Sequence, residues 1–248
     1  MQVSEDFKPF FNRAPKTRFL ALCAFIRRRI DFQLNTIYSD IYPYATTAQG
    51  TVLDIGCGDC FYKYLLNSGA RYIGMDIFEA ENFDYGKNSD IVRFDGTTIP
   101  LENQSVDHII CSEVLEHVSE PAPLIAEMHR VLKQGGDAFI TIPWSARFHY
   151  IPYDYARYTP SKLDDLFRAF AVRTVTARGT DITVICNKLV VAIFRQFYAQ
   201  KKISYWKLPL ALVLAPFVAL IIAWAHCSLW FGWGSSNDPL GYTIRLKK

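Results

Sequence analysis

The stretch from residue 51 to residue 67 constrains the fold of this chain more than any other. A short apolar run, residues 51–55, leads into Gly56-Cys57-Gly58, and residues 61–67 have helical character. An apolar run of this length that ends in glycines predicts a buried strand entering a tight turn. Glycine has no Cβ, so the backbone can pass close to a ligand, and the start of a helix offers free N–H groups. The stretch predicts a strand, a turn and a helix around a ligand site.

Similar short runs alternate with helical segments along the next hundred residues. Pro123 and Gly135-Gly136 mark the start and the end of one helix, and Thr159-Pro160 precede another. The predicted strands are residues 51–55, 71–77, 91–94, 106–111, 137–142 and 171–177. The predicted helices are residues 16–40 (one helix or two), 61–67, 121–133 and 161–170. This alternation predicts an α/β domain with a parallel, doubly wound sheet and a ligand site at the carboxyl ends of the strands.

Acidic residues beside the glycine turn indicate the kind of ligand. Asp54 immediately precedes the turn and would repel a pyrophosphate, but it suits the cationic amino group of a methionine moiety. Asp76 ends the second predicted strand, where a carboxylate meets the two hydroxyls of a ribose. The third glycine of a dinucleotide-binding loop is missing. A nicotinamide-dependent oxidoreductase is therefore disfavoured.

Five segments, in order, resemble the type-11 class I methyltransferases. They are D-I-G-C-G at 54–58, Y-I-G-M-D at 72–76, F-D-G-T-T-I-P-L at 94–101, V-D-H-I-I-C-S-E-V-L-E-H-V at 106–118 and R-V-L-K-Q-G-G at 130–136. The resemblance covers roughly residues 50–178, and the five matches together are specific. It implies a Rossmann-like, seven-stranded class I methyltransferase sheet and S-adenosyl-L-methionine (SAM) as the cofactor.

The resemblance also implies roles for individual residues. Asp54, Gly56 and Gly58 would hold the methionine end of SAM, and Asp76 its ribose. Cys60 departs from the small residue usual at its position in the family. The full set of expected cofactor-binding residues is Asp54, Gly56, Cys57, Gly58, Asp76, Ile77, Asp95 and Gly96 beside the adenine, and Ser112 and Glu113. For each acid taken singly, a helix cap or turn residue is the alternative.

The acceptor side of the site is expected in two segments. His117 follows the fourth predicted strand, and residues 149–158 follow the fifth. The second segment resembles the H-x-x-P-x-D-Y-x-R-Y-T pattern of methyltransferases of glycan and lipid pathways. The expected catalytic residues, which would deprotonate or bind an acceptor hydroxyl, are His149, Asp154 and His117. The expected substrate-binding residues are Tyr153, Arg157 and Tyr158. The alternatives are a packed helix histidine for His117 and a structural lid for residues 149–158.

The cysteines predict neither a disulfide framework nor a metal site. Cys57 and Cys60 match C-x-x-C, but a structural zinc site needs a second ligand pair and no suitable pair follows. A redox pair is conceivable, although the cofactor turn explains the surrounding glycines better. Residues 19–26 are apolar and follow basic residues, but Arg27-Arg28-Arg29 replaces a small-residue cleavage site. This predicts an amphipathic helix and no export signal.

A hydrophobic insertion separates the last two expected strands. Residues 241–246 fit strand seven, so some sixty residues interrupt a normally short connection. Residues 208–231 contain no charged side chain and are long enough to span a bilayer. Both ends must return to one sheet, which excludes a single crossing. Lys188, Arg195 and Lys202 recur every seven residues on an otherwise apolar segment, as in a helix lying among lipid headgroups.

We therefore expect monotopic or re-entrant association of residues 182–233 with the cytoplasmic face of a membrane. Pro216 could kink the longer segment, and the candidate interfacial anchors are Trp206, Trp224, Trp230 and Trp233. Residues 182–248 carry eight basic residues and one acid, a net charge of +7, whereas the preceding 181 residues carry −4. A basic and apolar tail favours an anionic membrane surface as partner, and no nucleic acid is expected. The alternative is a soluble homodimer that buries these helices.

These inferences divide the chain into four parts. Residues 1–49 are N-terminal helices, 50–180 the SAM-binding core, 181–239 the insertion and 240–248 the final strand. The leading functional hypothesis is methylation, on oxygen, of a lipid-linked saccharide or other glycolipid at the membrane. A quinone or other isoprenoid ring is the second acceptor. A catalytically degenerate methyltransferase fold that acts as a membrane scaffold is an alternative of another class.

Overall fold

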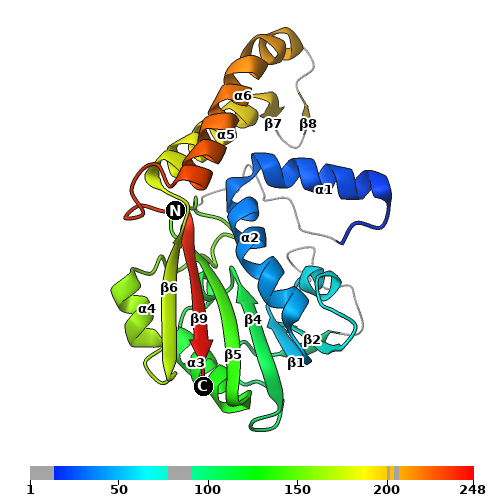
Figure 1. Cartoon of the computed structure of the whole chain (residues 1–248), viewed down its shortest axis with the longest axis vertical. Coiled ribbons are helices and arrows are strands. Elements are labelled where there is room, and N and C mark those ends of the chain that lie inside the picture. Colours follow the sequence, from blue (N-terminus) through cyan, green and yellow to red (C-terminus); the bar gives the residue numbers. More distant parts are fainter. Residues whose placement is uncertain (1–13, 78–90, 200–201, 204–206) are drawn as a thin grey trace.

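The computed structural model describes residues 14–77, 91–199, 202–203 and 207–248. Its centre is a seven-stranded sheet in the order β3-β2-β1-β4-β5-β9-β6, in which only β9 runs antiparallel to its neighbours (Figure 1). The strands are β1 (Gly50–Ile55), β2 (Ala70–Ile77), β3 (Val92–Phe94), β4 (Val106–Ser112), β5 (Leu132–Pro143), β6 (Val172–Arg178) and β9 (Gly241–Lys247). The predicted Rossmann-like methyltransferase sheet is thereby confirmed.

Alternating side chains of the strands supply two cores, one on each face of the sheet. Leu53 and Ile55 join one core, whereas Val52, between them, joins the other. The helices α3 (Pro121–Val131) and α4 (Pro160–Leu166) cover the first face, and α2 (Phe32–Thr47) covers the second. Successive residues of a strand point to opposite faces, so apolar runs with little alternation predict a sheet covered on both sides.

The carboxyl ends of the parallel strands align at one edge of the sheet. Ile55 pairs with Met75 and with Cys111, and Ile77 pairs with Phe94. The residues that follow β1 to β4 therefore meet at this edge, as predicted. Since β9 is antiparallel to both β5 and β6, β6 also ends at this edge. The insertion begins there.

Several predicted element ends differ from the structure. The expected helix over 61–67 is a single 3-10 turn, η1 (Phe61–Tyr64), because Asn67 ends it by bonding the Thr46 and Ala48 carbonyls and the Gly69 amide. The expected helix over 121–133 ends at Val131, since Leu132 already pairs with Val106 as the first residue of β5. Pairing between strands overrides local helical preference here.

Two helices precede the sheet, as the pattern over 16–40 allowed. The first, α1 (Arg18–Ile30), begins at Thr17, whose hydroxyl accepts a hydrogen bond from the Leu20 amide. Asp31 ends α1 and caps α2 by accepting from the Leu34 amide. Asp31 is extended, so the chain turns sharply between the two helices. No residue of α1 is buried, and most of its large apolar side chains are exposed.

The insertion between β6 and β9 forms a helical hairpin. It contains α5 (Asp181–Phe197), two short paired strands, β7 (Tyr198–Ala199) and β8 (Lys202–Ile203), and α6 (Leu208–Phe231). Figure 1 shows the hairpin projecting beyond the carboxyl edge of the sheet. The insertion is confirmed, and α6 continues through Pro216 as one helix. Trp206 and the side chain of Lys202 lie outside the described residues.

Hydroxyl groups hold the two ends of the hairpin together at its base. The Ser228 hydroxyl of α6 donates to the Trp233 carbonyl at 2.7 Å and lies 2.6 Å from the Thr180 hydroxyl and 3.2 Å from that of Thr183. All three side chains are buried. The Asp181 carboxylate accepts from the Ser235 amide at 2.8 Å. The two ends of the insertion are therefore held together by buried polar contacts.

Replacing Ser228 with alanine should destabilise the protein by about 1–3 kcal/mol, because buried hydrogen-bonding groups lose a partner. Urea unfolding in a mild detergent measures this change. Ser39→Ala is the control, since among the described residues the exposed Ser39 hydroxyl bonds only the Asn35 carbonyl of its own helix. Equal stability of the two variants would show that the buried hydroxyl contacts do not hold the hairpin.

Candidate SAM and acceptor site

The loop after β1 is held by backbone hydrogen bonds to β2. The amides of Gly56 and Cys57 both donate to the Met75 carbonyl, at 2.8 and 3.1 Å. Gly56 has a φ of 69°, and a Cβ there would clash with a methyl group of Val114. Only glycine satisfies both constraints. The glycine turn therefore lies as predicted, at the edge where β1, β2 and β4 end.

Asp76 joins this loop to the end of β2. Its Oδ2 accepts from the Gly58 amide at 2.8 Å, and its Oδ1 accepts from the Ile77 amide at 2.9 Å. Burial raises the pKa of Asp76, and the two amide hydrogen bonds oppose that rise. Each carboxylate oxygen keeps a second lone pair for the hydroxyls of a ribose. The position fits the ribose role that the resemblance implies for Asp76.

Asp54 lies beneath the turn and is almost completely buried, with 1% of its surface exposed. Its Oδ2 accepts from the Tyr72 hydroxyl at 2.6 Å, and its Oδ1 has no hydrogen-bond partner among the described residues. Burial raises the pKa of Asp54 well above its usual value. The unpartnered oxygen suits a cationic amino group. Sequence reasoning missed Tyr72, although it is the first residue of the Y-I-G-M-D segment.

Cys57 and Cys60 lie in the same loop. Their sulfur atoms are 3.9 Å apart, and both side chains are buried. Cys60 adopts a left-handed conformation with a φ of 56°, which glycine would adopt at lower cost. The hydrogen bond between the two thiols is the main cause that lowers the pKa of Cys60 to about 6. Cys60, the residue that departs from the family pattern, therefore adopts a strained backbone conformation in the turn.

The segment expected beside the adenine follows β3. Oδ1 of Asp95 accepts from the amides of Thr97 and Thr98, at 2.8 and 2.7 Å. Gly96 has a φ of 84° and lies against Ile77. Asp95 therefore caps a turn, which was the alternative considered for each acid. Its exposed position at the carboxyl edge is compatible with the adenine role, which stays a prediction.

Ser112 and Glu113 end β4 and are tied to other elements. The Ser112 hydroxyl accepts from the Tyr62 hydroxyl at 2.7 Å and lies 2.8 Å from the Thr141 hydroxyl of β5. Glu113 has a φ of 55° and forms an ion pair of 2.8 Å with Arg178, the last residue of β6. The Arg178 side chain is buried. No sequence pattern identifies Arg178, because its partner lies 65 residues away in the chain.

The loop after β5 gathers three of the expected acceptor residues. Arg157 donates to both oxygens of Asp154, and the His149 amide donates to Oδ2 of Asp154 at 3.0 Å. Burial alone would raise the pKa of Asp154, but these hydrogen bonds lower it. A carboxylate that is paired in this way is a weak proton acceptor. The geometry favours a positioning role for Asp154 toward His149 rather than the base role expected for it.

His117 meets this loop from the other side. It lies in η3 (Leu115–His117), which follows β4, and its ring is 4.8 Å from that of His149 and 5.2 Å from that of Tyr150. Burial is the main cause that lowers the pKa of His117 to about 4. His117 is thus neutral at physiological pH. The two expected histidines come together although they are far apart in the chain.

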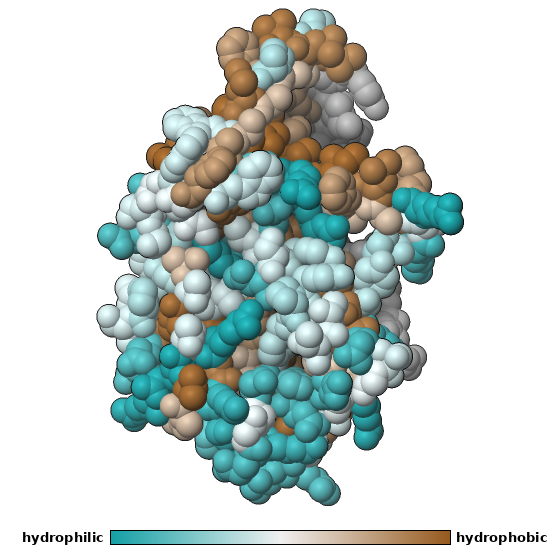
Figure 2. Space-filling view, viewed as in Figure 1, coloured by the Kyte–Doolittle hydropathy of each residue, from teal (hydrophilic) through white to brown (hydrophobic). Residues whose placement is uncertain are grey.

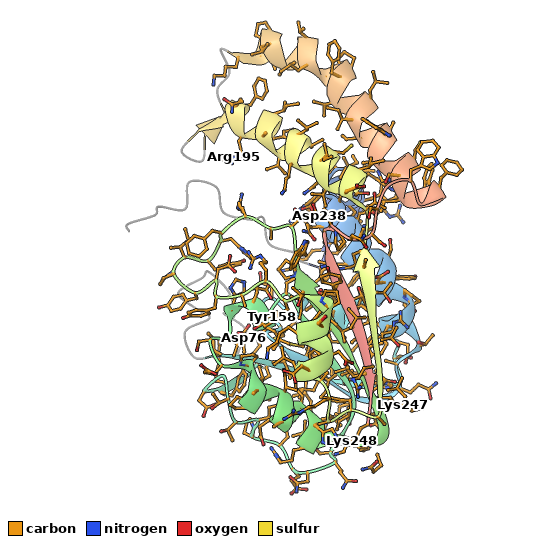
Figure 3. The ribbon with its side chains drawn as sticks, turned by 90° about the vertical axis from the view of Figure 1, so that its left-hand side faces the viewer. Asp76, Tyr158, Arg195, Asp238, Lys247 and Lys248 are labelled. Atoms are coloured by element: carbon orange, nitrogen blue, oxygen red, sulfur yellow. The ribbon has the colours of Figure 1, made fainter. Side chains whose placement is uncertain are left out.

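The expected substrate-binding tyrosines occupy different environments. Tyr153 is exposed, and its backbone carbonyl lies 2.7 Å from Nδ1 of His117. Tyr158 is buried in the core, where its hydroxyl donates to the Leu115 carbonyl at 3.1 Å. Figure 3 labels both Tyr158 and Asp76 on this part of the molecule. The buried Tyr158 side chain thus stabilises the segment around Leu115 through this hydrogen bond. This position favours a structural role over contact with an acceptor.

Comparisons with known proteins agree with this geometry. Residues 53–140 match the methyltransferase domain family Methyltransf_11. A ubiquinone biosynthesis O-methyltransferase of Hahella chejuensis is 36% identical over 102 residues, which are 36% of this chain and 42% of that protein. An uncharacterized methyltransferase of Mycobacterium ulcerans is 34% identical over 115 residues, covering 43% of this chain and 45% of that protein. The chain thus spans less than half the length of these relatives.

Solved structures share the fold. A SAM-dependent methyltransferase from Archaeoglobus fulgidus aligns with a TM-score of 0.54 and 17% identity, over 91% of this chain and 99% of that one. Phosphoethanolamine N-methyltransferase 2 of Haemonchus contortus, in complex with S-adenosylhomocysteine, aligns with a TM-score of 0.52 and 14% identity, over 86% of this chain and 52% of that one. We call the glycine loop after β1, residues 56–60, the SAM loop. Together with this loop, the family match and the shared fold show that the chain carries a class I SAM-dependent methyltransferase domain.

Proposed function

We propose that this chain is a SAM-dependent O-methyltransferase that acts at the cytoplasmic face of a membrane on an amphiphilic, lipid-anchored acceptor. One observation carries the proposal. The apolar helical hairpin leaves the sheet at the same edge at which the SAM loop and the histidines lie, since β6 ends there. The catalytic edge would therefore face the surface to which the hairpin binds.

Three helices contribute exposed apolar side chains at this end of the molecule. We call this set the apolar end. Its members are Phe19, Leu22 and Phe25 of α1, Ile185, Leu189 and Phe194 of α5, and Leu212, Val213, Phe217, Leu220, Trp224 and Trp230 of α6. Figure 2 shows apolar residues gathered over the hairpin and along α1. Patches of this kind on soluble monomers are small. The patch supports docking to a membrane.

Helices α1 and α6 of the apolar end contact each other, and α5 carries basic residues. His226 of α6 lies 2.9 Å from the Arg29 carbonyl of α1, and its ring is 5.1 Å from that of Phe32. Arg195 lies toward the outer end of α5, beyond the sheet (Figure 3). Exposed cations beside apolar side chains favour anionic headgroups. By length and apolar composition α6 could cross a bilayer, and little of it is buried. The cations on α5 favour monotopic or re-entrant insertion of the hairpin.

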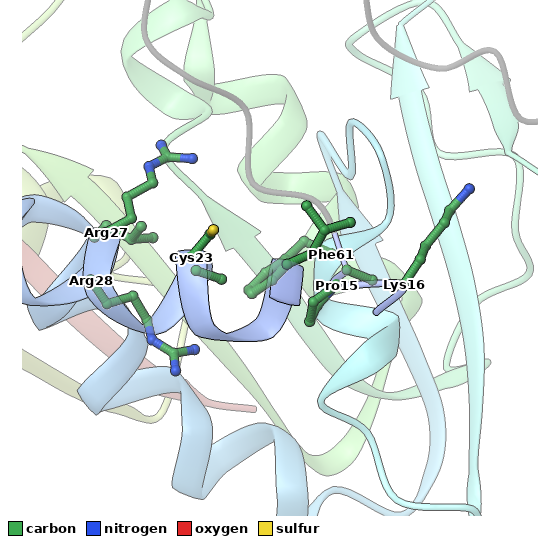
Figure 4. Close-up of a pocket in the computed structure, with 10 residues that line it drawn as sticks. Pro15, Lys16, Cys23, Arg27, Arg28 and Phe61 are labelled. Atoms are coloured by element: carbon green, nitrogen blue, oxygen red, sulfur yellow. The ribbon is translucent and has the colours of Figure 1, made fainter. Parts of the chain in front are cut away.

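A groove under α1 supports an amphiphilic acceptor. It has a volume of about 510 Å³. Its lining combines cationic side chains, namely Lys16, Arg27 and Arg28, with apolar ones that include Leu20 and Phe61 (Figure 4). Phe61 belongs to η1, immediately after the SAM loop. Such a groove suits a chain that bears an anionic group near its polar head, as in a pyrophosphate-linked glycolipid, which is our first choice of acceptor.

A quinone precursor is the second candidate acceptor. The relatives in Hahella chejuensis and Saccharophagus degradans are named ubiquinone biosynthesis O-methyltransferases, with 36% and 31% identity over about a hundred residues. A phenolic hydroxyl on an isoprenoid ring would also enter from a membrane. In both cases methyl transfer from a sulfonium mainly requires alignment and exclusion of water.

Label transfer tests the proposal. Purified protein and methyl-labelled SAM are incubated with a membrane lipid extract and, separately, with soluble metabolites of the same cells. We expect label in the organic phase only. Mild acid should release it from a pyrophosphate-linked glycolipid, whereas acid-stable label identifies a ring acceptor. Label confined to water-soluble products would refute the lipid acceptor. A protein that neither binds SAM nor transfers label would instead be a membrane scaffold.

A further inference from the structure

Three side chains with metal-ligating atoms converge where the loops after β4 and β5 meet. Glu116 and His117 come from η3, and His149 comes from the loop after β5. One ligand atom from each lies within 4.8 Å of those of the other two. The Glu116 side chain is fully buried, and neither of its carboxylate oxygens has a hydrogen-bond partner among the described residues. A buried carboxylate without partners is costly, and coordination of a cation offsets that cost.

Backbone carbonyls determine which nitrogen of each imidazole carries the proton. Nδ1 of His117 is 2.7 Å from the Tyr153 carbonyl, and Nδ1 of His149 is 2.9 Å from the Arg147 carbonyl. A carbonyl oxygen only accepts hydrogen bonds, so both Nδ1 atoms must be donors. The lone pair of each ring therefore lies on Nε2. In the case of His117, Nε2 is 3.7 Å from Glu116 Oε1. Metal-bound histidines are held in this manner.

The neighbouring cations are committed to other carboxylates. Arg157 pairs with Asp154 and Arg178 pairs with Glu113, as described above. Within the described part of the chain, nothing at hydrogen-bond distance neutralises Glu116. The cluster thus offers two imidazole nitrogens and one carboxyl group to a cation.

We propose that Glu116, His117 and His149 bind a divalent transition-metal ion, Zn²⁺ in the first instance, at the acceptor side of the site. Two histidines and one glutamate form a ligand set of catalytic zinc sites, in which a further position stays open for water or substrate. The sequence alone predicts no metal at these residues, because His149 lies 32 positions after His117 and no ligand spacing along the chain joins them.

The ion gives the histidines a role in the proposed function, on which this part of the inference rests. The acceptor hydroxyl would occupy the open position, where the ion lowers its pKa so that the proton leaves to solvent. The alkoxide or phenoxide oxygen then forms a bond to the methyl carbon while the bond from that carbon to the sulfonium sulfur breaks. S-adenosylhomocysteine and the methyl ether are the products. His117 and His149 act here as ligands and not as bases.

Metal binding is measured on the full chain after treatment with a chelator. Isothermal titration with Zn²⁺ should give one site per chain, Co²⁺ should develop visible d–d absorption, and Zn²⁺ should raise the Tm. Glu116→Gln and His149→Asn should each weaken Zn²⁺ binding at least roughly 100-fold, as loss of an outer-shell partner alone costs 10- to 100-fold. Glu116→Gln should leave the Tm of the metal-free protein unchanged or higher, because it removes a buried unpaired charge.

His129→Ala is the matched control, since His129 lies in α3 against Phe170 and outside the cluster. Its affinity for Zn²⁺ should equal that of the wild type. Absence of Zn²⁺ binding by the wild type would overturn the proposal. So would binding that survives Glu116→Gln and His149→Asn but is lost in Cys60→Ser, because the thiol pair of the SAM loop would then be the site. SAM affinity measured on the same samples separates failure of the metal site from failure of the proposed function.

Discussion

Replacing Asp76 with alanine should raise the Kd for SAM by about 10²- to 10³-fold. The Asp76 carboxylate accepts from the Gly58 and Ile77 amides and keeps lone pairs for two ribose hydroxyls. Each hydrogen bond to a charged group contributes about 1.5–3 kcal/mol, and 1.4 kcal/mol corresponds to a factor of ten. Asp76→Ala loses both ribose contacts and also the hydrogen bond that holds the Gly58 amide. These losses together give the expected increase in Kd. Isothermal titration with SAM measures it.

Asp76→Asn separates the two contributions. The asparagine amide oxygen can still accept from the Gly58 amide, but the charge toward the ribose is lost, so we expect an intermediate affinity. Asp165→Ala is the control, because Asp165 is an exposed residue of α4 that pairs with Lys162. A folded Asp76→Ala protein that binds SAM as tightly as the Asp165→Ala control would refute the ribose role.

Replacing four apolar residues of α6 with glutamine should reduce partition into anionic vesicles by about 10³-fold. The residues are Leu212, Val213, Phe217 and Leu220, whose side chains are 59–70% exposed. Transfer of a half-exposed apolar side chain into lipid contributes on the order of 1 kcal/mol, so four of them contribute about 4 kcal/mol. The side chains are largely exposed, so the fold should persist. Flotation of the protein with vesicles measures the partition.

Tyr64→Gln combined with Val172→Gln is the matched control. Both side chains are more than half exposed, but they lie on η1 and β6, away from the hairpin. We expect wild-type partition for this variant, and wild-type SAM affinity for the variant of α6. If the wild type does not float with vesicles but becomes monomeric on substitution of α6, the apolar end is a homodimer interface and the membrane proposal fails.

Local patterns were enough to predict the sheet. Apolar runs of strand length, glycine turns and helix boundaries each depend on residues that lie within a few positions of one another in the chain. The side-chain alternation at Val52 and Leu53 then follows from strand geometry alone. The positions of Asp54 and Asp76 also followed, because the carboxyl ends of parallel strands must meet at one edge.

The ends of several elements were not predictable in this way. Leu132 has helical neighbours but belongs to β5, because pairing with Val106 and burial in the core outweigh its local preference. Residues 61–67 were expected to be a helix, but the contacts of Asn67 end it after one turn. A helix of this length gains little from its own hydrogen bonds. Contacts with distant residues therefore decide its end.

The sequence by itself determined the class I fold, the SAM loop and the apolar insertion, because periodicity, glycine turns and uninterrupted apolarity act over short distances. Only the tertiary structure decided the partners of the buried charged groups. It forms the ion pairs of Arg178 with Glu113 and of Arg157 with Asp154. It also brings Glu116, His117 and His149 together. The physical reason is that burial and electrostatic pairing depend on distances in space, which the spacing of residues along the chain does not contain.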